Sequence, residues 1–211
     1  MIIAIDGPAA AGKGTIAARL AAHLGLPHLD TGLLYRAIGR KIALAGLDPG
    51  DAAAAGRIAE TIRSEDLADP SLRGHEAGEL ASRVAVHAEV RRALLGFQRN
   101  FARGPQGAVL DGRDIGTAIL PEADVKIFVT ASPEVRAVRR TAELQAKGRD
   151  VSYERILAEI LSRDARDSGR AAAPLAIAPD AHVLDTSDLD REGAFQAALA
   201  IVQERTSRLR T

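Results

Sequence analysis

Residues 7–15, Gly-Pro-Ala-Ala-Ala-Gly-Lys-Gly-Thr, have the composition of a phosphate-binding loop. They follow an apolar run at 2–5, which predicts a buried strand. Gly7 and Gly12 allow the chain to turn so tightly that several backbone N–H groups point inward, and such a nest binds anions. Lys13 adds a full positive charge for phosphate oxygens, and a helix beginning near it would direct its positive N-terminal end at them. The stretch therefore predicts phosphoryl transfer.

The hydroxyl residue of this loop, Thr15, comes one position later than in the commonest form of the motif, after Gly14 rather than directly after Lys13. This variant is similar to the loop of the nucleoside monophosphate kinases. Residues 12–17 also fit the weaker dinucleotide-binding pattern Gly-x-Gly-x-x-Ala, with Asp30 about where a ribose-binding acid is expected. We rank that interpretation second because it leaves Lys13 without a role.

Residues 111–117, Asp-Gly-Arg-Asp-Ile-Gly-Thr, bring two acids and an arginine to the end of another apolar run. If that run is a parallel strand, the three charged side chains lie at the edge of the sheet where open α/β folds bind their ligands. The same stretch leaves open a simpler role for Asp114, in which it only orients Arg113. It therefore indicates a second part of a binding site.

The segment from about 149 to 170 has the composition of a lid. Its charged residues crowd the far end of a helix that is predicted to begin near 152: Arg163, Arg166, Asp167 and Arg170. Ion pairs at i,i+4 spacing usually only stabilise a solvated helix, by about 0.2–0.5 kcal/mol each. The position of this segment between two predicted strands favours instead a role in neutralising phosphate charge.

The pattern of the whole chain predicts an α/β fold that positions these stretches along one sheet edge. Apolar runs predict strands at about 2–5, 28–30, 108–111, 125–129 and 182–185, and helical spacing fills most of the intervals, ending with a helix at 194–203. Between about 47 and 102 the sequence is rich in alanine and charge, and no strand is predicted there. We interpret 1–211 as one domain with an all-helical insert.

Thr31, Tyr35 and Arg36 follow the second predicted strand and lie near the start of the next helix. Polar groups at such a helix end often meet a ligand. From this stretch alone the plainer interpretation is preferred, in which the residues cap the helix and Arg36 is solvated.

The composition excludes several other classes of protein. Lys and Arg total 28, as do Asp and Glu, so no global field favours nucleic acid or a membrane surface. The 211 residues include no cysteine, which rules out disulfides and thiolate metal sites, and the five histidines show no ligand spacing. No stretch approaches the length of a membrane span. We therefore expect a cytoplasmic protein without a membrane or nucleic-acid partner.

Six stretches in order, 7–15, 30–36, 82–85, 90–91, 111–117 and 163–175, closely resemble the bacterial cytidylate kinases. That resemblance implies a P-loop nucleoside monophosphate kinase fold, with a five-stranded parallel sheet flanked by helices, a helical nucleotide-binding insert at about 47–102 and a short lid at about 149–170. It also implies phosphorylation of CMP and dCMP with ATP and Mg²⁺, and it suggests a monomer. The small β-hairpin that many members carry in the insert does not fit residues 57–80, which are too few and too helical.

The resemblance assigns roles to particular residues. ATP would be bound by Gly7, Pro8, Ala9, Ala10, Ala11, Gly12, Lys13, Gly14 and Thr15, and the Thr15 hydroxyl would also meet Mg²⁺. Cytosine would contact Ser82, Arg91 and Asp114; the acceptor phosphate would contact Arg36, Arg113 and Arg170; the sugar would contact Tyr35, Arg163 and Asp167, with Thr31 beside the same site. Catalysis by charge neutralisation would rest on Lys13, Arg113, Arg163 and Arg170.

Other functions remain open at this stage. A kinase of the same kind could act on UMP, AMP or shikimate. A non-catalytic GTP switch would normally offer an Asn-Lys-x-Asp motif, whereas the single asparagine of the chain, Asn100, stands in a different context. A dinucleotide-binding dehydrogenase is the third alternative.

Overall fold

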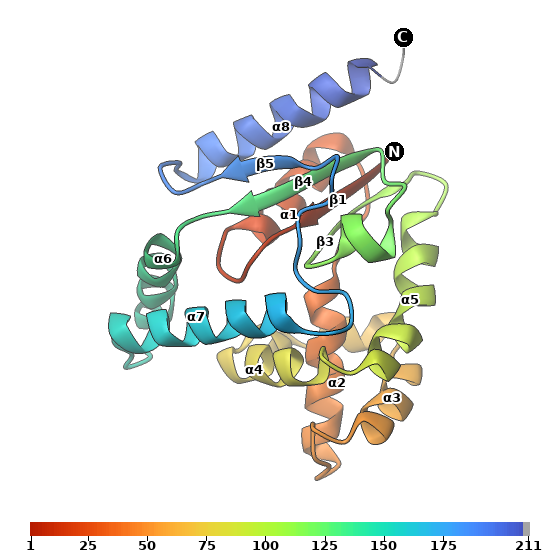
Figure 1. Cartoon of the computed structure of the whole chain (residues 1–211), viewed down its shortest axis with the longest axis vertical. Coiled ribbons are helices and arrows are strands. Elements are labelled where there is room, and N and C mark those ends of the chain that lie inside the picture. The colour runs from red at the N-terminus through yellow and green to blue at the C-terminus, as the bar shows by residue number, and fades with distance from the viewer. Residues whose placement is uncertain (209–211) are drawn as a thin grey trace.

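The fold is an open parallel sheet whose carboxyl edge carries the predicted site (Figure 1). The computed structural model describes residues 1–208, with the backbone alone for His75 and Arg208. All strand pairs are parallel, in the order β2-β3-β1-β4-β5. The strands are β1 Ile2–Asp6, β2 His28–Asp30, β3 Ala108–Gly112, β4 Val125–Thr130 and β5 His182–Asp185. The predicted five-stranded parallel sheet is confirmed, with shifts of one residue at strand ends.

Helices occupy the intervals between the strands, and their starts follow local sequence signals. Asp30 caps the second helix by accepting from Gly32 N, and Ser132 with Pro133 opens the sixth. The helices are α1 Lys13–Leu24, α2 Thr31–Leu44, α3 Ala52–Glu60, α4 His75–Val84, α5 Ala88–Ala102, α6 Pro133–Ala146, α7 Tyr153–Gly169 and α8 Arg191–Arg208, with short turns η1 Ser64–Ala68, η2 Pro70–Arg73 and η3 Ile115–Ile119. The last helix is longer than the predicted 194–203, because its first turn includes polar residues without an apolar period.

The three central strands, β3, β1 and β4, are buried on both faces, as parallel strands normally are, whereas the edge strand β5 exposes Val183. Alternate residues of β1 enter different cores: Ile3 and Ile5 pack with α1 and α8, whereas Ala4 packs with the core under α2 and α5. Figure 1 shows α8 on one side of the sheet and α2 to α5 gathered at the other end of the molecule. The layers therefore leave the carboxyl edge of the strands as the place where a ligand can enter.

The helical insert predicted at 47–102 contains α3, η1, η2, α4 and α5, and no strand lies within those described residues. The expectation that 57–80 lack a β-hairpin is thus confirmed. Helix α4 packs closely on α2 at Gly39, where an added Cβ would lie 2.7 Å from Leu80 Cβ. A side chain at Gly39 would force the two helices apart, so this glycine fixes how the insert sits beside the sheet.

Helix α7 packs against α6 through a small apolar cluster of its own, formed by Ala137, Leu144, Ile156 and Ile160. The predicted apolar side of the helix, at Ile156 and Ile160, is confirmed. In Figure 1 this pair of helices lies beyond the carboxyl end of β4, and α7 runs across the front of the molecule between the sheet and α4. Among residues 1–208 no helix combines the length and apolar character needed to cross a bilayer.

Candidate active site

The phosphate loop leaves β1 and enters α1 through residues with left-handed backbone conformations. Ala10 has φ 61° and Gly12 has φ 90°. Gly7 is required by crowding rather than by a ligand, because a Cβ there would lie 2.0 Å from the Val129 carbonyl oxygen on β4. Burial, and then the neighbouring charge of Arg113, lower the pKa of Lys13 to about 8. Asp111 and Asp30 oppose this shift, but within residues 1–208 Lys13 makes no ion pair, which leaves its charge available to a phosphate.

A cavity of about 720 Å³ lies on the outer side of this loop. Six of the nine predicted ATP-binding residues line it, and Gly7, Pro8 and Ala9 do not; the six are Ala10, Ala11, Gly12, Lys13, Gly14 and Thr15. Its far wall comes from α6 and from the segment after β5, where Arg139 donates to the carbonyl oxygens of Thr186 at 2.6 Å and Leu189 at 3.1 Å. Sequence reasoning missed this wall, although Thr186 follows a predicted strand at the edge that binds ligands.

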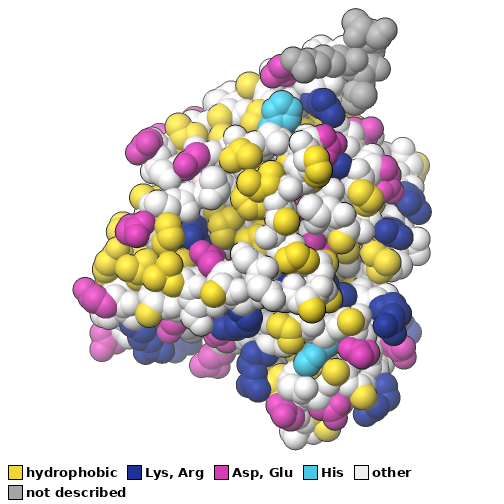
Figure 2. All heavy atoms as spheres, in the orientation of Figure 1, with side chains coloured by type: hydrophobic (Ala, Val, Ile, Leu, Met, Phe, Trp, Pro, Cys, Tyr) yellow, Lys and Arg dark blue, Asp and Glu magenta, His cyan; other side chains and the backbone are white. Residues whose placement is uncertain are grey.

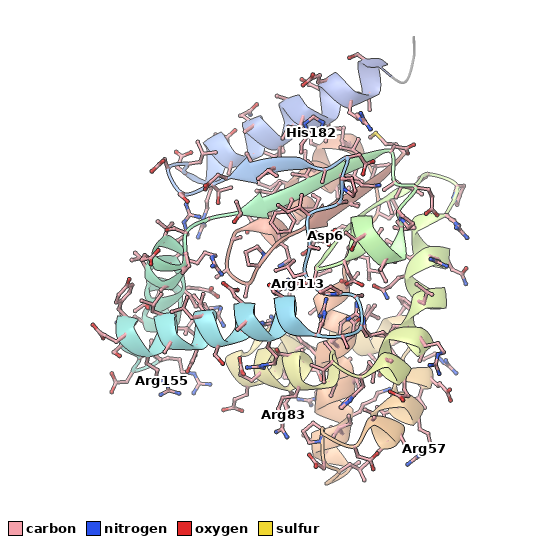
Figure 3. All side chains as sticks on the ribbon, viewed as in Figure 1. Asp6, Arg57, Arg83, Arg113, Arg155 and His182 are labelled. Carbon is pink, nitrogen blue, oxygen red and sulfur yellow. The ribbon has the colours of Figure 1, made fainter. Side chains whose placement is uncertain are left out.

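A second cavity, of about 150 Å³, lies on the inner side of the loop and is shared with it through Lys13 and Gly14. The structure brings all ten residues predicted to bind substrate to this one cavity, from the second helix to the end of the seventh: Thr31, Tyr35, Arg36, Ser82, Arg91, Arg113, Asp114, Arg163, Asp167 and Arg170. Figure 3 shows Arg113 deep between the sheet and α7. Residues spread over most of the chain therefore form one polar chamber beside the phosphate loop.

The inner end of this chamber is organised by Asp114. Its buried carboxylate accepts a hydrogen bond from Arg91 Nη2, and Arg170 Nη2 lies 3.7 Å from its other oxygen. The guanidinium of Arg91 also lies 5.7 Å from the ring centre of Tyr35. Arg113, which the sequence left as the simpler partner of Asp114, instead pairs with Asp167. The alternative in which Asp114 only orients Arg113 is therefore wrong.

Asp167 gathers the arginines of the outer end. Arg113 Nε donates to it at 2.9 Å, and Arg163 Nε lies 3.9 Å from the same oxygen. Burial acts to raise the pKa of Asp167, but the two arginine charges outweigh it and lower the pKa below its usual value. Burial, followed by the charge of Arg113, lowers the pKa of Arg163 to about 10. One carboxylate thus faces an excess of positive charge.

Two of these guanidinium groups have buried nitrogens that make no hydrogen bond in the described part of the chain, although each lies within 4 Å of a carboxylate oxygen, at 3.9 Å for Arg163 and 3.7 Å for Arg170. Within residues 1–208, Arg163 Nε and Arg170 Nη2 are inaccessible to solvent and make no hydrogen bond. A buried unpaired donor costs about 1–3 kcal/mol, and more when charged, so such atoms are normally satisfied by something. An anion in the chamber would satisfy both.

Thr31 and Arg36 have structural partners as well as a place in the chamber. Thr31 Oγ1 donates to the Asp111 carbonyl oxygen at 2.8 Å, and Arg36 Nη1 donates to the Leu72 carbonyl oxygen at 2.7 Å. The helix cap is Asp30, not Thr31. The preferred expectation that Arg36 is solvated is wrong, because the helical insert covers it.

Asp6, the last residue of β1, holds the loop that carries Asp114. Its two carboxylate oxygens accept from the backbone N–H groups of Ile115 at 2.8 Å and Gly116 at 2.7 Å. Burial raises the pKa of Asp6 to about 6, although the two hydrogen bonds oppose the shift. The sequence shows Asp6 only as a break in an apolar run. This contact ties the strand before the phosphate loop to the loop at the other cavity.

Two further acids, Asp30 and Asp111, lie beside Lys13 and bear on whether a metal ion would fit. Burial and then the charge of Asp111 raise the pKa of Asp30, and a Cβ on Gly14 would lie 3.7 Å from Asp111 Oδ2. His28 Nε2 lies 2.8 Å from Asp111 Oδ1, a contact that sequence reasoning missed. No cluster of three or more His, Cys, Asp or Glu suited to a metal occurs in the described part of the chain.

The surface around the chamber carries no dominant charge. Figure 2 shows Lys and Arg side chains interspersed with Asp and Glu over the face of α7 and the insert. This agrees with the balanced composition of the chain. On this face the surface charge is therefore mixed in sign, whereas the buried cavity carries several arginines.

The structures most informative for the fold share little sequence with this chain. An uncharacterized protein from Eubacterium ventriosum has a TM-score of 0.57 with 16% identity, covering 96% of this chain and 98% of its own. A gluconokinase from Sinorhizobium meliloti has a TM-score of 0.52 with 13% identity, covering 99% and 94%. At these identities the likeness concerns the fold alone, an open parallel α/β sheet flanked by helices.

The sequence comparisons identify the family. The family model described as cytidylate kinase matches residues 3–204. A cytidylate kinase of Paramagnetospirillum magneticum is 61% identical over 204 residues, which cover 95% of this chain and 97% of that protein. A cytidylate kinase of Methylocella silvestris is 58% identical over 210 residues, covering 100% and 97%. The chain belongs to the cytidylate kinase family.

Proposed function

We infer that the chain is an ATP-dependent cytidylate kinase that converts CMP to CDP, and we propose that it also accepts dCMP. The observation that carries the assignment is the shared position of Lys13 between two cavities, one beside the phosphate loop and one holding the buried, unpaired arginine nitrogens. A donor and an acceptor phosphate placed in these cavities would meet at Lys13. Family membership then fixes which kinase this is.

Recognition of the base is proposed to rest on Asp114. When ionised, its carboxylate can only accept hydrogen bonds, so it suits the exocyclic amine of cytosine and repels the corresponding carbonyl of uracil. Arg91 and Arg170 hold this carboxylate in place. Ser82 and Arg91, which line the same cavity, are proposed to complete the base contacts.

The acceptance of dCMP is proposed from the environment of Asp167, which the resemblance places against the sugar. Its carboxylate is already held by Arg113 and flanked by Arg163 without a ligand. When dCMP binds, the missing 2′-hydroxyl therefore does not leave the carboxylate of Asp167 without partners. The loss of one neutral hydrogen-bond partner should cost little binding free energy.

Transfer itself is proposed to proceed by positioning and charge neutralisation. Arg36, Arg113 and Arg170 would hold the acceptor phosphate, and Lys13 with Arg163 would balance the charge that builds on the transferring group. Arg136 on α6 holds the C-terminal half of α7, because it donates to both carboxylate oxygens of Asp164, at 3.0 and 2.6 Å. No side-chain nucleophile is needed.

Magnesium fits the oxygen donors at the inner end of the loop. We propose that the Thr15 hydroxyl and the carboxylates of Asp30 and Asp111, which lie beside Lys13, would hold it, directly or through water, together with the phosphates of ATP. Mg²⁺ is usually held in this way, by one or two carboxylates and substrate phosphates rather than by an all-protein cage. When bound it would offset the charge of the phosphates. Burial, and then the charge of Asp111, raise the pKa of Asp30, and a divalent cation at this place would oppose that shift.

The division of labour within 1–211 is also proposed: 47–102 as the nucleotide-binding insert and 149–170 as a lid. The segment has its own apolar cluster with α6, and near its far end Arg163 lies close to the like charges of Arg113 and Arg36. Burial, and then these charges, lower the pKa of Arg163 to about 10. We expect amide hydrogen exchange in 149–170 to slow when a bisubstrate nucleotide binds. Equal protection with and without that nucleotide would contradict a lid.

The setting proposed for the enzyme is a cytoplasmic monomer. The absence of cysteine from all 211 residues suits a reducing compartment, and the family resemblance suggests a monomer. Light scattering coupled to gel filtration would test the monomer, and a dimer at micromolar concentration would contradict it.

The deciding experiment is ADP production from ATP and Mg²⁺ with CMP, dCMP, UMP, AMP or no acceptor, measured side by side. We expect rapid turnover with CMP, turnover with dCMP within about tenfold of it, and much weaker turnover with UMP and AMP. ADP production without acceptor at a similar rate would indicate a hydrolase instead. Turnover with CMP alone would remove dCMP from the proposal.

A further inference from the structure

Arg166 joins the lid to the helix that carries Ser82. Its Nη1 donates to Ser82 Oγ at 2.7 Å and lies 3.6 Å from Glu79 Oε2. Arg166 belongs to α7, whereas Ser82 and Glu79 belong to α4, 84 residues away along the chain. Arg166 does not line the acceptor cavity, but Ser82 does. The contact therefore reaches the site through Ser82.

A guanidinium group can only donate hydrogen bonds, so Ser82 must use an oxygen lone pair toward Arg166. Within residues 1–208, Ser82 Oγ makes no other side-chain hydrogen bond. Its own O–H is therefore left to donate into the cavity, and its side chain, 3% exposed as a residue, is held in one of the staggered rotamers that a serine can otherwise exchange. Arg166 thus decides both where the hydroxyl lies and which role it plays.

We propose that Arg166 is a positioning residue that links closure of the lid to recognition of the acceptor base, by fixing the hydroxyl of Ser82. The proposal rests on the proposed function, because Ser82 is placed against cytosine only by the family resemblance. The hydrogen bond from Arg166 can form only when α7 lies against α4, so Ser82 is oriented only in the closed arrangement. An acceptor that uses this hydroxyl therefore binds best to the closed lid, and its binding favours closure.

The test is a double-mutant cycle on Arg166→Ala and Ser82→Ala, with kcat and KM measured separately for CMP and for ATP. If Arg166 acts through Ser82, Arg166→Ala should raise the KM for CMP about fivefold to tenfold, the size typical of one neutral hydrogen bond, here that of the Ser82 hydroxyl to the base. The KM for ATP should stay within about twofold, because the ATP cavity does not include Arg166. The double variant should then match Ser82→Ala alone.

Two further variants separate this role from a general effect on the fold. Arg83→Ala is the matched control, since Arg83 stands next to Ser82 on α4 but pairs with exposed Asp48 at 3.4 Å, and Figure 3 shows it directed away from α7. It should behave as the wild type. Arg166→Lys keeps a charged donor without the guanidinium fork, so it should recover part of the lost affinity for CMP.

Several results would overturn the proposal. They are multiplying effects of the two substitutions, an equal rise in the KM for ATP, and wild-type kinetics in a folded Arg166→Ala. If Arg166→Ala fails to fold, the double-mutant cycle is measured with Arg166→Lys and Ser82→Ala instead. An unchanged KM for CMP in Arg166→Lys, together with no coupling energy between the two substitutions, would overturn the proposal. A wild-type protein without turnover on CMP would instead overturn the proposed function.

Discussion

The two cavities at the sheet edge are built in opposite ways. The side proposed to bind ATP, the ATP side, is centred on one continuous stretch of chain, and α6 and the segment after β5 add its far wall. Its main binding groups are backbone N–H groups, left-handed turns at Ala10 and Gly12, and the charge of Lys13. The side proposed to bind the acceptor, the acceptor side, is lined mainly by side chains from α2, the helical insert, the loop after β3 and the end of α7. One side is centred on a local turn, and the other exists only when the fold has brought distant segments together.

This difference teaches where each side is sensitive to change. A backbone site tolerates most side-chain substitutions, because its binding groups are present in every residue. A side-chain site depends on each charged partner, and the loss of one leaves another buried without compensation. We expect few but severe sensitive positions on the ATP side and many graded ones on the acceptor side.

The largest expected effect concerns the one indispensable side chain of the ATP side. Lys13→Ala should leave a folded protein with kcat reduced by about a hundredfold to a thousandfold, because the lost charge acts mainly on the transition state. Steady-state kinetics with CMP would measure it, with Lys41→Ala as a control, since Lys41 pairs with Asp66 on the insert. Near-normal turnover in Lys13→Ala would show that the loop has been misassigned.

The next effect tests the junction of the two sides at Asp6. Its pKa is raised from 3.8 to about 6 in the folded protein, so the folded state holds this proton more tightly than the unfolded chain. Between pH about 4 and 6 the folded state therefore binds more protons, and the free energy of unfolding should fall as pH rises through that window, by up to about 3 kcal/mol from this group.

Asp6→Asn cannot ionise, so it should lack this contribution. Urea unfolding of both proteins from pH 4 to 7 would measure it as the difference between the two curves. In Asp6→Asn the amide NH₂ group replaces one of the two oxygens that accept from the backbone N–H groups, so one of these N–H groups loses its acceptor. The free energy of unfolding of Asp6→Asn should therefore be lower than that of the wild type throughout pH 4 to 7. Parallel curves would mean that Asp6 titrates normally and does not hold the loop as an acid.

A third effect sharpens the view of the acceptor side as a set of specific charges. Asp114→Ala should lose about tenfold to a hundredfold of the preference for CMP over UMP in kcat/KM, because one charged hydrogen bond is worth about 1.5–3 kcal/mol. Because the substitution also strands Arg91, Asp114→Asn should be measured beside it as the variant with less risk to folding. An unchanged ratio of CMP to UMP in both variants would remove Asp114 from base recognition.

The smallest effect is expected on the ATP side, at Ala10. Ala10→Gly removes the cost of a left-handed conformation at φ 61° but makes the unfolded chain more flexible and takes a methyl group from the lid cluster. These terms oppose each other, so stability should change by less than about 1 kcal/mol and kcat/KM for ATP by less than about threefold. A loss as large as that of Lys13→Ala would contradict a loop that acts through its backbone.

The ATP side and the sheet could be predicted from the sequence because their signals are local. Runs of β-branched residues mark the strands, and the loop from 7 to 15 is one motif. The closing helix was predicted too short because its first turn, beginning at Arg191, carries no apolar period. The short turn η3, in which Asp6 is the acceptor for two backbone groups, gives no local signal at all.

The acceptor side could not be worked out from spacing. Ion pairs such as Arg113 with Asp167 join residues 54 positions apart, and nothing in either segment names its partner. The stretch 111–117 even suggested a pairing of its two neighbours, whereas Asp114 turned to Arg91 on a helix of the insert. Only the resemblance to a family grouped those residues, and the roles it implies stay predictions until the variants are measured.

The small cluster between α6 and the lid has a consequence for how such an enzyme adapts to temperature. Its four buried residues, Ala137, Leu144, Ile156 and Ile160, hold α7 against α6, and Ala10 of the phosphate loop packs against them. None of the four lines the cavity proposed for the acceptor. If opening of the proposed lid limits turnover, trimming or enlarging one methyl group here would change the opening rate without removing any side chain that is proposed to bind substrate. Evolution in cold or hot surroundings thus has a place to adjust speed without touching specificity.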